Sequence, residues 1–307
     1  MVKYIIKRFL FSLLTLWVMY TAVFFLMHII PGNPFLGEKS LPPDIIAAQM
    51  AKYGFDKPLI IQYFIYTGHL LQGDFGISLK QMGMTVNRII GNSFPQSAKI
   101  GGLGILFSLV IGIPLGLISA MKRNKPTDKI AMFFATLGTS LPSFVVATVV
   151  MYFFCLKHFW LPSMGLDTPK SYILPVFALT FFSLCVVARL ARSSMLEVIH
   201  QDYIRTARAK GLPEWKVILK HALKNAIIPV VTYTGPMAAG ILTGSFVIES
   251  IFTVAGLGKY FVQSINNRDY SVILGVTILY GAILIILNFA VDILYGVLDP
   301  RIRIEKN

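Results

Sequence analysis

The sequence predicts an all-α membrane protein with six transmembrane helices, and three observations support this fold class. Hydrophobic residues make up 55% of the 307 residues and charged residues only 14%, whereas a soluble domain carries about 25% charged residues. The charges are confined to a few stretches. Between them lie long apolar runs, and a run of about 20 apolar residues crosses a bilayer as a helix.

Six runs that contain no Asp, Glu, Lys or Arg approach or exceed this length. We expect them to be the transmembrane helices, at residues 9–30, 100–121, 130–156, 171–188, 225–248 and 270–291. The fourth run is the shortest. The first run is longer than the apolar region of a signal peptide, which has about 7–15 residues. We therefore expect an uncleaved anchor.

The distribution of basic residues predicts the orientation in the membrane. With six spans, 18 of the 28 Lys and Arg residues fall on one side. That side holds residues 1–8, 121–129, 189–224 and 292–307. Because cytoplasmic loops are enriched in Lys and Arg, both the N and the C termini are predicted to be cytoplasmic. The net charge of +14 thus reflects membrane orientation, and we expect no nucleic-acid partner.

The segments on the other side include residues 31–99 and 249–269, which form predicted outer loops. The first loop is long, and its pattern indicates two short helices rather than a flexible linker. Proline precedes apolar residues at helical spacing over residues 42–50, and a similar pattern covers residues 57–71 before Gly73.

The predicted cytoplasmic segment 189–224 reads as two helices joined by a turn. Apolar residues recur at helical spacing over residues 193–210. Gly211 then stands where a left-handed helix end requires glycine, and Pro213 and Glu214 are suited to begin a second helix. In that second helix the spacing places Trp215, Ile218, Leu219 and Ala222 on one side and Lys216, Lys220 and Lys224 on another. Such a basic hairpin fits either the inner membrane surface or a groove on a soluble partner.

Residues 202–212 (DYIRTARAKGL) and 221–229 (HALKNAIIP) closely resemble the cytoplasmic loop of binding-protein-dependent ABC importer permeases. In that family a Glu-Ala-Ala triplet is followed, four residues after its second alanine, by a glycine. Ala207 and Gly211 hold these two positions, while Arg205 and Thr206 replace Glu and Ala. The replacement resembles the peptide and nickel branch of the family.

The resemblance extends along the chain and includes the long outer loop, which is similar to that of the first permease, the B-type subunit, of oligopeptide transporters. The matching stretches are residues 7–8, 30–34, 53–59, 62–63, 73–78, 252–258, 267–270, 292–295 and 298–301. This resemblance implies the type I permease fold of ABC importers. It also implies a permease subunit that forms half of the translocation pathway of an ATP-driven importer of oligopeptides or dipeptides. Nickel or another small solute is the alternative substrate.

The resemblance further implies a set of partners in a bacterial or archaeal cytoplasmic membrane. They are a second homologous permease that completes a heterodimer, two ATP-binding-cassette ATPase subunits and an extracytoplasmic substrate-binding protein, with membrane lipid around the spans. ATP and Mg are expected on the ATPase subunits. We therefore expect this chain to bind no cofactor and to be no enzyme.

Two groups of candidate functional residues follow. The resemblance implies an ATPase-docking loop at Arg205, Thr206, Ala207, Gly211, Leu212 and Trp215. The fifth predicted span is rich in proline and small or hydroxyl residues, which either line a pathway or allow close helix packing; both interpretations remain open. The pathway candidates are Thr232, Thr234, Gly235, Pro236, Gly240 and Gly244.

Other functional classes receive little support from the sequence. The glycine-rich stretch 255–259 lacks the spacing of a phosphate-binding loop. The five histidines are scattered, so no metal site is expected. A secondary, ion-coupled transporter needs ionisable residues at mid-membrane depth, whereas Arg189, Glu249 and Asp292 all lie near the ends of predicted spans.

Overall fold

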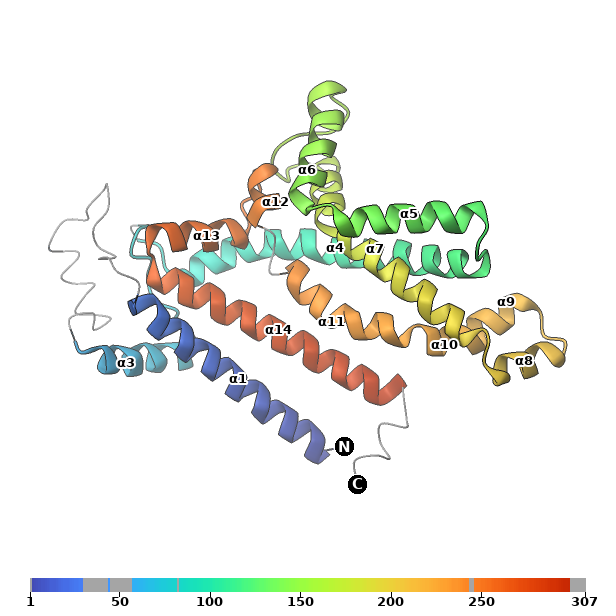
Figure 1. Cartoon of the computed structure of the whole chain (residues 1–307). Coiled ribbons are helices and arrows are strands. Elements are labelled where there is room, and N and C mark those ends of the chain that lie inside the picture. Colours follow the sequence, from blue (N-terminus) through green and yellow to red (C-terminus); the bar gives the residue numbers. More distant parts are fainter. Residues whose placement is uncertain (1, 30–43, 45–56, 82, 243–245, 299–307) are drawn as a thin grey trace. The chain divides into compact units, whose positions relative to one another are not determined.

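The computed structural model describes residues 2–29, 44, 57–81, 83–242 and 246–298 (Figure 1). Within these residues the regular structure is helical, with one isolated bridge between Ile77 and Thr85. Among them, five helices are long and apolar enough to cross a membrane, or six if one sharply bent pair counts as a single span. The predicted outer helix over residues 42–50, apart from residue 44, and the pathway candidate Gly244 lie outside the described residues.

The chain divides into two compact units. The first comprises Val2–Ser97 and Ala255–Ile285, and the second comprises Ala98–Val254 and Ile286–Asn307. Two helices, α4 (Val86–Met121) and α14 (Tyr270–Leu298), contribute residues to both units.

Aromatic side chains form the core of the first unit. Helix α1 (Val2–Ile29) and helix α3 (Leu59–Leu71) meet through stacked Tyr20 and Tyr63, whose ring centroids are 5.3 Å apart. Tyr270 and Leu274 at the start of α14 join the same buried cluster. Helix α3 lies where the sequence predicts the second outer helix, residues 57–71.

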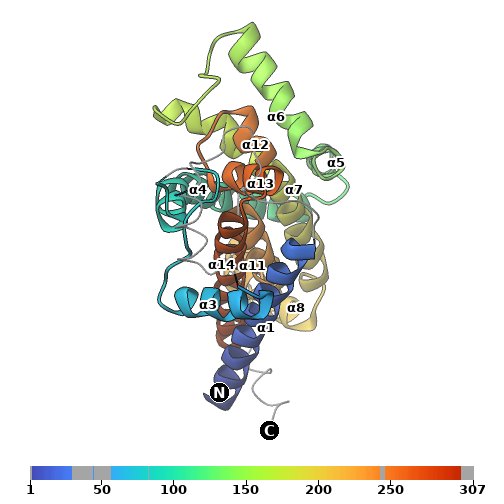
Figure 2. The same ribbon diagram turned by 90° about the vertical axis from the view of Figure 1, so that its left-hand side faces the viewer.

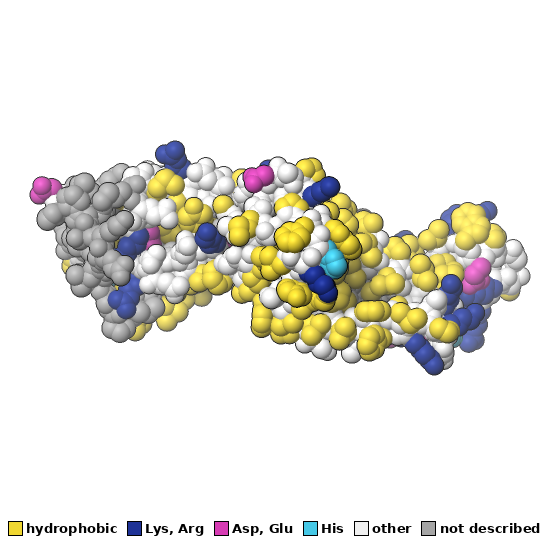
Figure 3. All heavy atoms as spheres, turned by 90° about the horizontal axis from the view of Figure 1, so that it is seen from above, with side chains coloured by type: hydrophobic (Ala, Val, Ile, Leu, Met, Phe, Trp, Pro, Cys, Tyr) yellow, Lys and Arg dark blue, Asp and Glu magenta, His cyan; other side chains and the backbone are white. Residues whose placement is uncertain are grey.

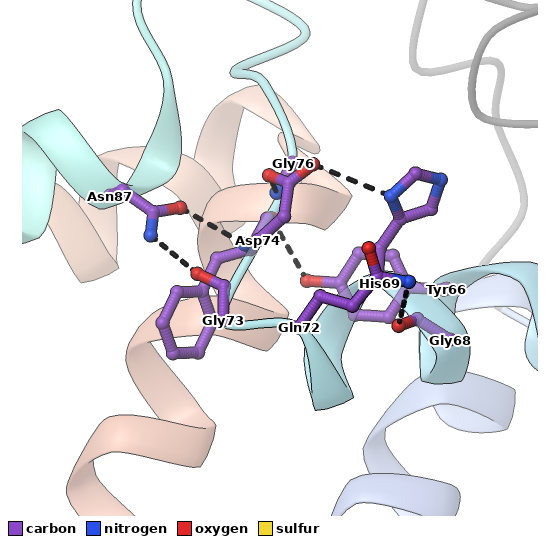
Figure 4. A network of polar contacts seen from close by, with 9 residues as sticks. Tyr66, Gly68, His69, Gln72, Gly73, Asp74, Gly76 and Asn87 are labelled. Carbon is purple, nitrogen blue, oxygen red and sulfur yellow. Dashed lines mark hydrogen bonds and ion pairs between the residues drawn. The ribbon is translucent and has the colours of Figure 1, made fainter.

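Hydrogen bonds to side chains fix the turn between α3 and α4 (Figure 4). Asn87 accepts a hydrogen bond from the Phe75 backbone N–H at 3.0 Å and donates one to the Gly73 carbonyl at 2.6 Å. The Asp74 carboxylate accepts the Gly76 N–H at 2.9 Å and lies 3.4 Å from the Nδ1 of His69. Residues 73–76, which follow α3, therefore have a defined shape and are not a flexible linker.

Helix α4 begins at Val86, although the sequence places residues up to 99 in the outer loop. The hydroxyl of Thr85 accepts the Arg88 N–H at 3.2 Å, as an N-cap residue does. The predicted start at residue 100 followed the last charge, Lys99, but a charged residue does not interrupt a helix. The predicted outer loop 249–269 also contains a helix, α13 (Leu257–Asn267).

The second unit contains most of the remaining helices. In chain order they are α5 (Pro126–Ser140), α6 (Ser143–Met151), a π-helical turn (Tyr152–Lys157), a short 3-10 turn (Pro169–Tyr172), α7 (Ile173–Val198), α8 (Asp202–Ala209), α9 (Glu214–Lys216), a second π-helical turn (Val217–Ala222), α10 (Leu223–Ala226), α11 (Ile228–Leu242) and α12 (Phe246–Ile251).

The third predicted span, residues 130–156, is not one continuous helix. Helices α5 and α6 meet at an angle of 107°, and the bend is visible in Figures 1 and 2. Pro142 lacks a backbone N–H and disfavours a helical conformation at the preceding residue. Leu141 accordingly has the extended values φ −88° and ψ 129°. The sequence prediction missed this break because it defined the span only by the absence of charged residues.

Helix α7 is longer than the predicted fourth span, residues 171–188, because it continues to Val198. The first helix expected in the cytoplasmic segment, residues 193–210, is therefore wrong as a single element. Its first residues belong to α7, and α8 begins separately at Asp202 after extended Gln201. Neither proline nor glycine marks this break in the sequence.

The fifth predicted span, residues 225–248, falls on helices α10, α11 and α12. One candidate span covers Ile228–Ile251, and residues 243–245 within it lie outside the described residues. Pro236 lies inside α11 without ending it.

Glycine allows α4 to lie close against α7. A Cβ atom added at Gly112 would lie 2.8 Å from Cγ1 of Val187 and 3.0 Å from the Leu184 carbonyl oxygen. One turn further on, a Cβ at Gly116 would collide with the carbonyl oxygen of Ala188. Side chains at these positions would push the two helices apart.

Candidate functional site

The segment from α8 to α10 is packed firmly onto the end of α7. Ile204 and Ala207 of α8 are buried against Val217 and Ala222, which follow α9, and against Met195 of α7. Asn225 of α10 donates a hydrogen bond to the Tyr203 hydroxyl of α8 at 2.7 Å. Helix α8 is therefore held against the end of the long helix α7.

The turn between α8 and α9 has the geometry that the sequence predicts. Gly211 has φ +73°, in the left-handed region, and its N–H donates to the Arg208 carbonyl at 2.9 Å. Pro213 is the N-cap of α9, and Glu214 lies in its first turn. The predicted left-handed glycine at position 211 is confirmed.

An ion pair closes this turn. Arg208 donates to both carboxylate oxygens of Glu214, from Nη2 at 2.7 Å and from Nε at 3.2 Å. The hydrogen bond from Arg208 lowers the pKa of the Glu214 carboxyl. Both side chains are about half exposed, so the pair contributes little to stability but holds α8 and α9 in register. Sequence reasoning did not single out Arg208.

The exposed face of the segment from α8 to α10 carries basic side chains around exposed apolar ones. Lys and Arg side chains gather over α8 and α9, at the right of Figure 3. Arg205 and Thr206 are exposed, as are Trp215 at 61% and Leu219 at 56%. We call Arg205, Thr206, Trp215 and Leu219 the loop face.

Four residues of the segment lie away from the loop face. Ala207 is buried and Leu212 is partly buried, so both support the face from within. Ile218 and Ala222, which α-helical spacing places beside Trp215, are buried on the opposite side. The cause is the π-helical turn Val217–Ala222, whose wider turns change the direction of successive side chains.

A cavity of about 620 Å³ lies at the break between α5 and α6. It is lined by the ends of those two helices, with the hydroxyls of Thr139, Ser140 and Ser143, and by parts of α7 and α11. Arg189 of α7 donates to the Thr139 hydroxyl at 2.6 Å and to the Ala135 carbonyl at 3.0 Å, which holds the end of α5. Within a membrane, irregular backbone is tolerated where it is buried in protein or lines a water-filled cavity.

The structure separates the pathway candidates into two groups. Pro236 and Gly240 line the cavity, and a Cβ added at Gly240 would meet no described atom within 4 Å. Thr232 and Thr234 are not among the lining residues, and their hydroxyls donate to carbonyl oxygens of their own helix at 2.9 and 2.8 Å.

Gly235 serves packing rather than the cavity. It is buried, and a Cβ there would lie 3.0 Å from Cγ2 of Val291 and 3.1 Å from Oδ1 of Asn288, both on α14. The two interpretations of the fifth span therefore apply to different residues, with close packing at Gly235 and cavity lining at Pro236 and Gly240.

A buried ion pair joins three helices beside the cytoplasmic segment expected between the second and third spans. Arg192 of α7 donates to both oxygens of Asp128 in α5, at 2.7 and 2.8 Å. Asp128 also accepts the Ser119 hydroxyl of α4 at 2.5 Å and the Asn124 N–H at 2.9 Å. Only 4% of the Asp128 side chain is exposed. This cluster was not predicted, because its charged members are 64 residues apart in the sequence.

A sharply bent helix pair at a cavity and a basic loop packed onto a long helix are features that suit a component of a membrane transport system. The chain belongs to the family of binding-protein-dependent transport system inner membrane components, which matches residues 112–304. The N-terminal part of such membrane components matches residues 1–108. The predicted family and the multi-pass inner-membrane location are thereby confirmed.

Relatives of this chain align over nearly its whole length. The oligopeptide transport system permease protein OppB of Haemophilus influenzae is 46% identical over 305 residues, covering 99% of this chain and 100% of the relative. The Escherichia coli OppB is 45% identical with the same coverage. The dipeptide transport system permease protein DppB of Bacillus subtilis is 46% identical over 306 residues, covering 100% of this chain and 99% of the relative.

Solved structures share the fold. A chain of the MetNI methionine ABC transporter, in an inward-facing conformation, aligns with a TM-score of 0.57 at 18% identity, covering 69% of this chain and 96% of the other. A chain of an amino acid ABC transporter aligns with a TM-score of 0.51 at 18% identity, covering 70% and 94%. The predicted fold class is confirmed, while the side of the membrane on which the termini lie stays a prediction.

Proposed function

We propose that this chain is the permease subunit that forms half of the translocation pathway of an ATP-driven importer of oligopeptides or dipeptides. The observation that carries the proposal is the identity of 45–46% to OppB and DppB permeases over their full length. The substrate class follows from the names of these relatives.

In this proposal the chain works with a second homologous permease, two ATPase subunits that bind ATP and Mg, and an extracytoplasmic binding protein. The loop face is the ATPase-docking surface. Trp215 and Leu219 provide exposed apolar side chains of the kind that fill a groove on a partner, and the basic residues around them favour an acidic rim. Because α8 is packed onto α7, movement of the docked ATPase is transmitted to a spanning helix.

The cavity at the α5–α6 break is the proposed part of the passage in this subunit. Its hydroxyl groups can hydrogen bond to the polar backbone of a peptide, and its apolar residues leave side-chain selection loose. A broken helix there provides polar groups at a depth where a continuous helix would provide none.

Transport by the reconstituted complex tests the proposal. Both permeases and both ATPases are inserted into vesicles, the binding protein and a labelled pentapeptide are added, and uptake is measured with and without ATP. We expect uptake that needs ATP and every subunit. Uptake driven by a proton gradient without ATP, or uptake of nickel in preference to peptide, would contradict the proposal.

Replacing Gly240 by leucine is expected to block peptide uptake while the complex still assembles. The added side chain would project into the cavity without striking a described neighbour. Peptide uptake by vesicles and the yield of assembled complex on size-exclusion chromatography are the two measurements.

The matched control is Gly235→Leu on the same helix. Its side chain would collide with Val291 and Asn288, so the expected defect is a loss of folded complex. Normal uptake by Gly240→Leu would show that the cavity is not part of the passage. Equal losses of assembly in both variants would show that Gly240 also serves packing.

A further inference from the structure

An apolar crevice lies between α4, α5 and α7, apart from the cavity at the helix break. Its volume is about 410 Å³. Its lining is almost wholly hydrocarbon and includes Ile118 of α4, Ile130, Ala131 and Phe134 of α5, and Leu184 of α7. Ile118, Ile130 and Phe134 are each at least half exposed, so the crevice can be reached from outside the unit.

The crevice ends at a strongly basic turn. Ser119 and Thr127, which also line it, flank the turn that connects α4 to α5. This turn carries Lys122, Arg123 and Lys125, and Lys129 follows in the first turn of α5; all four side chains are exposed. Among the described residues, no ion pair of these four cations is present.

Asp128 is the one acidic residue in residues 119–129, and its charge does not face an anion bound at the turn. Asp128 is buried, and both of its carboxylate oxygens accept hydrogen bonds from Arg192. Ser119 and the Asn124 backbone occupy its remaining acceptor positions. The ion pair thus removes the negative charge from the surface, and the turn presents cations alone.

We propose that the crevice and the basic turn together form a binding site for an anionic phospholipid. One acyl chain lies in the crevice, and the phosphate group lies against the cations of the turn. A basic cluster at the end of an apolar slot between spanning helices complements the two chemical parts of such a lipid. A neutral lipid would fill the slot equally well but would gain nothing from the turn.

Lipid retained by the purified complex tests this site independently of transport. The assembled transporter is incubated in mild detergent with equal amounts of phosphatidylglycerol and phosphatidylcholine, and native mass spectrometry measures the lipid that stays with this subunit. We expect phosphatidylglycerol to be preferred. Because each basic residue near the headgroup contributes about 1 kcal/mol, Lys125→Gln with Lys129→Gln should reduce that preference at least about tenfold.

Two further variants separate the parts of the site. Lys157→Gln with Lys170→Gln removes the same charge from residues of this unit outside the crevice and its turn, and should leave the preference unchanged. Ala131→Leu fills the crevice, so it should reduce the retention of both lipids while the headgroup preference persists. Glycerophosphoglycerol, the headgroup without acyl chains, should fail to displace the bound lipid.

Three results would overturn the proposal. One is equal retention of the two lipids by the unaltered complex, as expected if a protein partner covers the crevice. Another is an equal loss of preference in the Lys157 and Lys170 variant. The last is displacement by the soluble headgroup, which would reduce the site to a phosphate-binding turn.

Discussion

Replacing Asp128 by alanine is expected to destabilise the chain by about 3–5 kcal/mol, because the change leaves a partly buried guanidinium without its counter-charge. Arg192 has only 22% of its side chain exposed and directs both donors at Asp128. Ser119 and the Asn124 N–H lose their acceptor as well. Thermal unfolding of the detergent-purified complex, followed by the loss of the monodisperse peak, should show a midpoint lowered by about 10 °C.

A second substitution tests whether the loss of stability comes from the unpaired charge of Arg192 or from the lost contacts of Asp128. Adding Arg192→Met to Asp128→Ala removes both charges and keeps an apolar side chain against α5. The double variant should recover much of the lost stability, since a buried pair replaced by apolar groups is often neutral. A double variant whose loss equals the sum of two independent losses would show that the charges act separately.

The exposed pair at the turn between α8 and α9 provides the matched comparison. Arg208 and Glu214 are also joined by two hydrogen bonds, but both are about half exposed. Glu214→Ala should therefore cost at most about 1 kcal/mol. If it lowers the midpoint as much as Asp128→Ala does, burial is not the reason for the effect at Asp128.

The Asp128 cluster shows where sequence reasoning reached its limit. Long apolar runs indicate spanning helices, because the bilayer imposes a length and excludes charge. They carry no information on which residue pairs with which, since Asp128 and Arg192 are 64 residues apart and several basic residues could pair with Asp128. Pairing depends on how α4, α5 and α7 pack, and that packing rests on glycines whose role is visible only in three dimensions.

Local backbone chemistry was predictable only where one residue type determines it. Gly211 was identified because a left-handed helix end favours glycine, and its φ of +73° confirms this. Pro142 has an equally specific chemistry, and α5 ends just before it. The prediction missed this end because it followed the uncharged run across the proline. Trp215 and Ile218 were placed on the same face because the spacing assumed an α-helix, and the π-helical turn separated them.

Gly211→Asp is expected to abolish peptide uptake while the partner ATPases continue to hydrolyse ATP. The backbone cost is small, since aspartate is among the residues that adopt left-handed values and an added Cβ would meet no described atom within 4 Å. The charge is the larger change. The new carboxylate would compete with Glu214 for Arg208 and would place a negative charge on the basic segment that carries the loop face.

Gly211→Asn is the isosteric control, because it has the same shape and backbone preference without the charge. We expect it to retain most uptake, and uptake and ATP hydrolysis are measured together on the same vesicles for both variants. Uptake at the normal rate with Gly211→Asp would contradict the docking role of the loop face. Equal losses with Asp and Asn would mean that glycine's backbone, and not the charge of the surface, connects the ATPase to α7. A loss limited to Asp would place the electrostatic contact between α8 and the ATPase within reach of position 211.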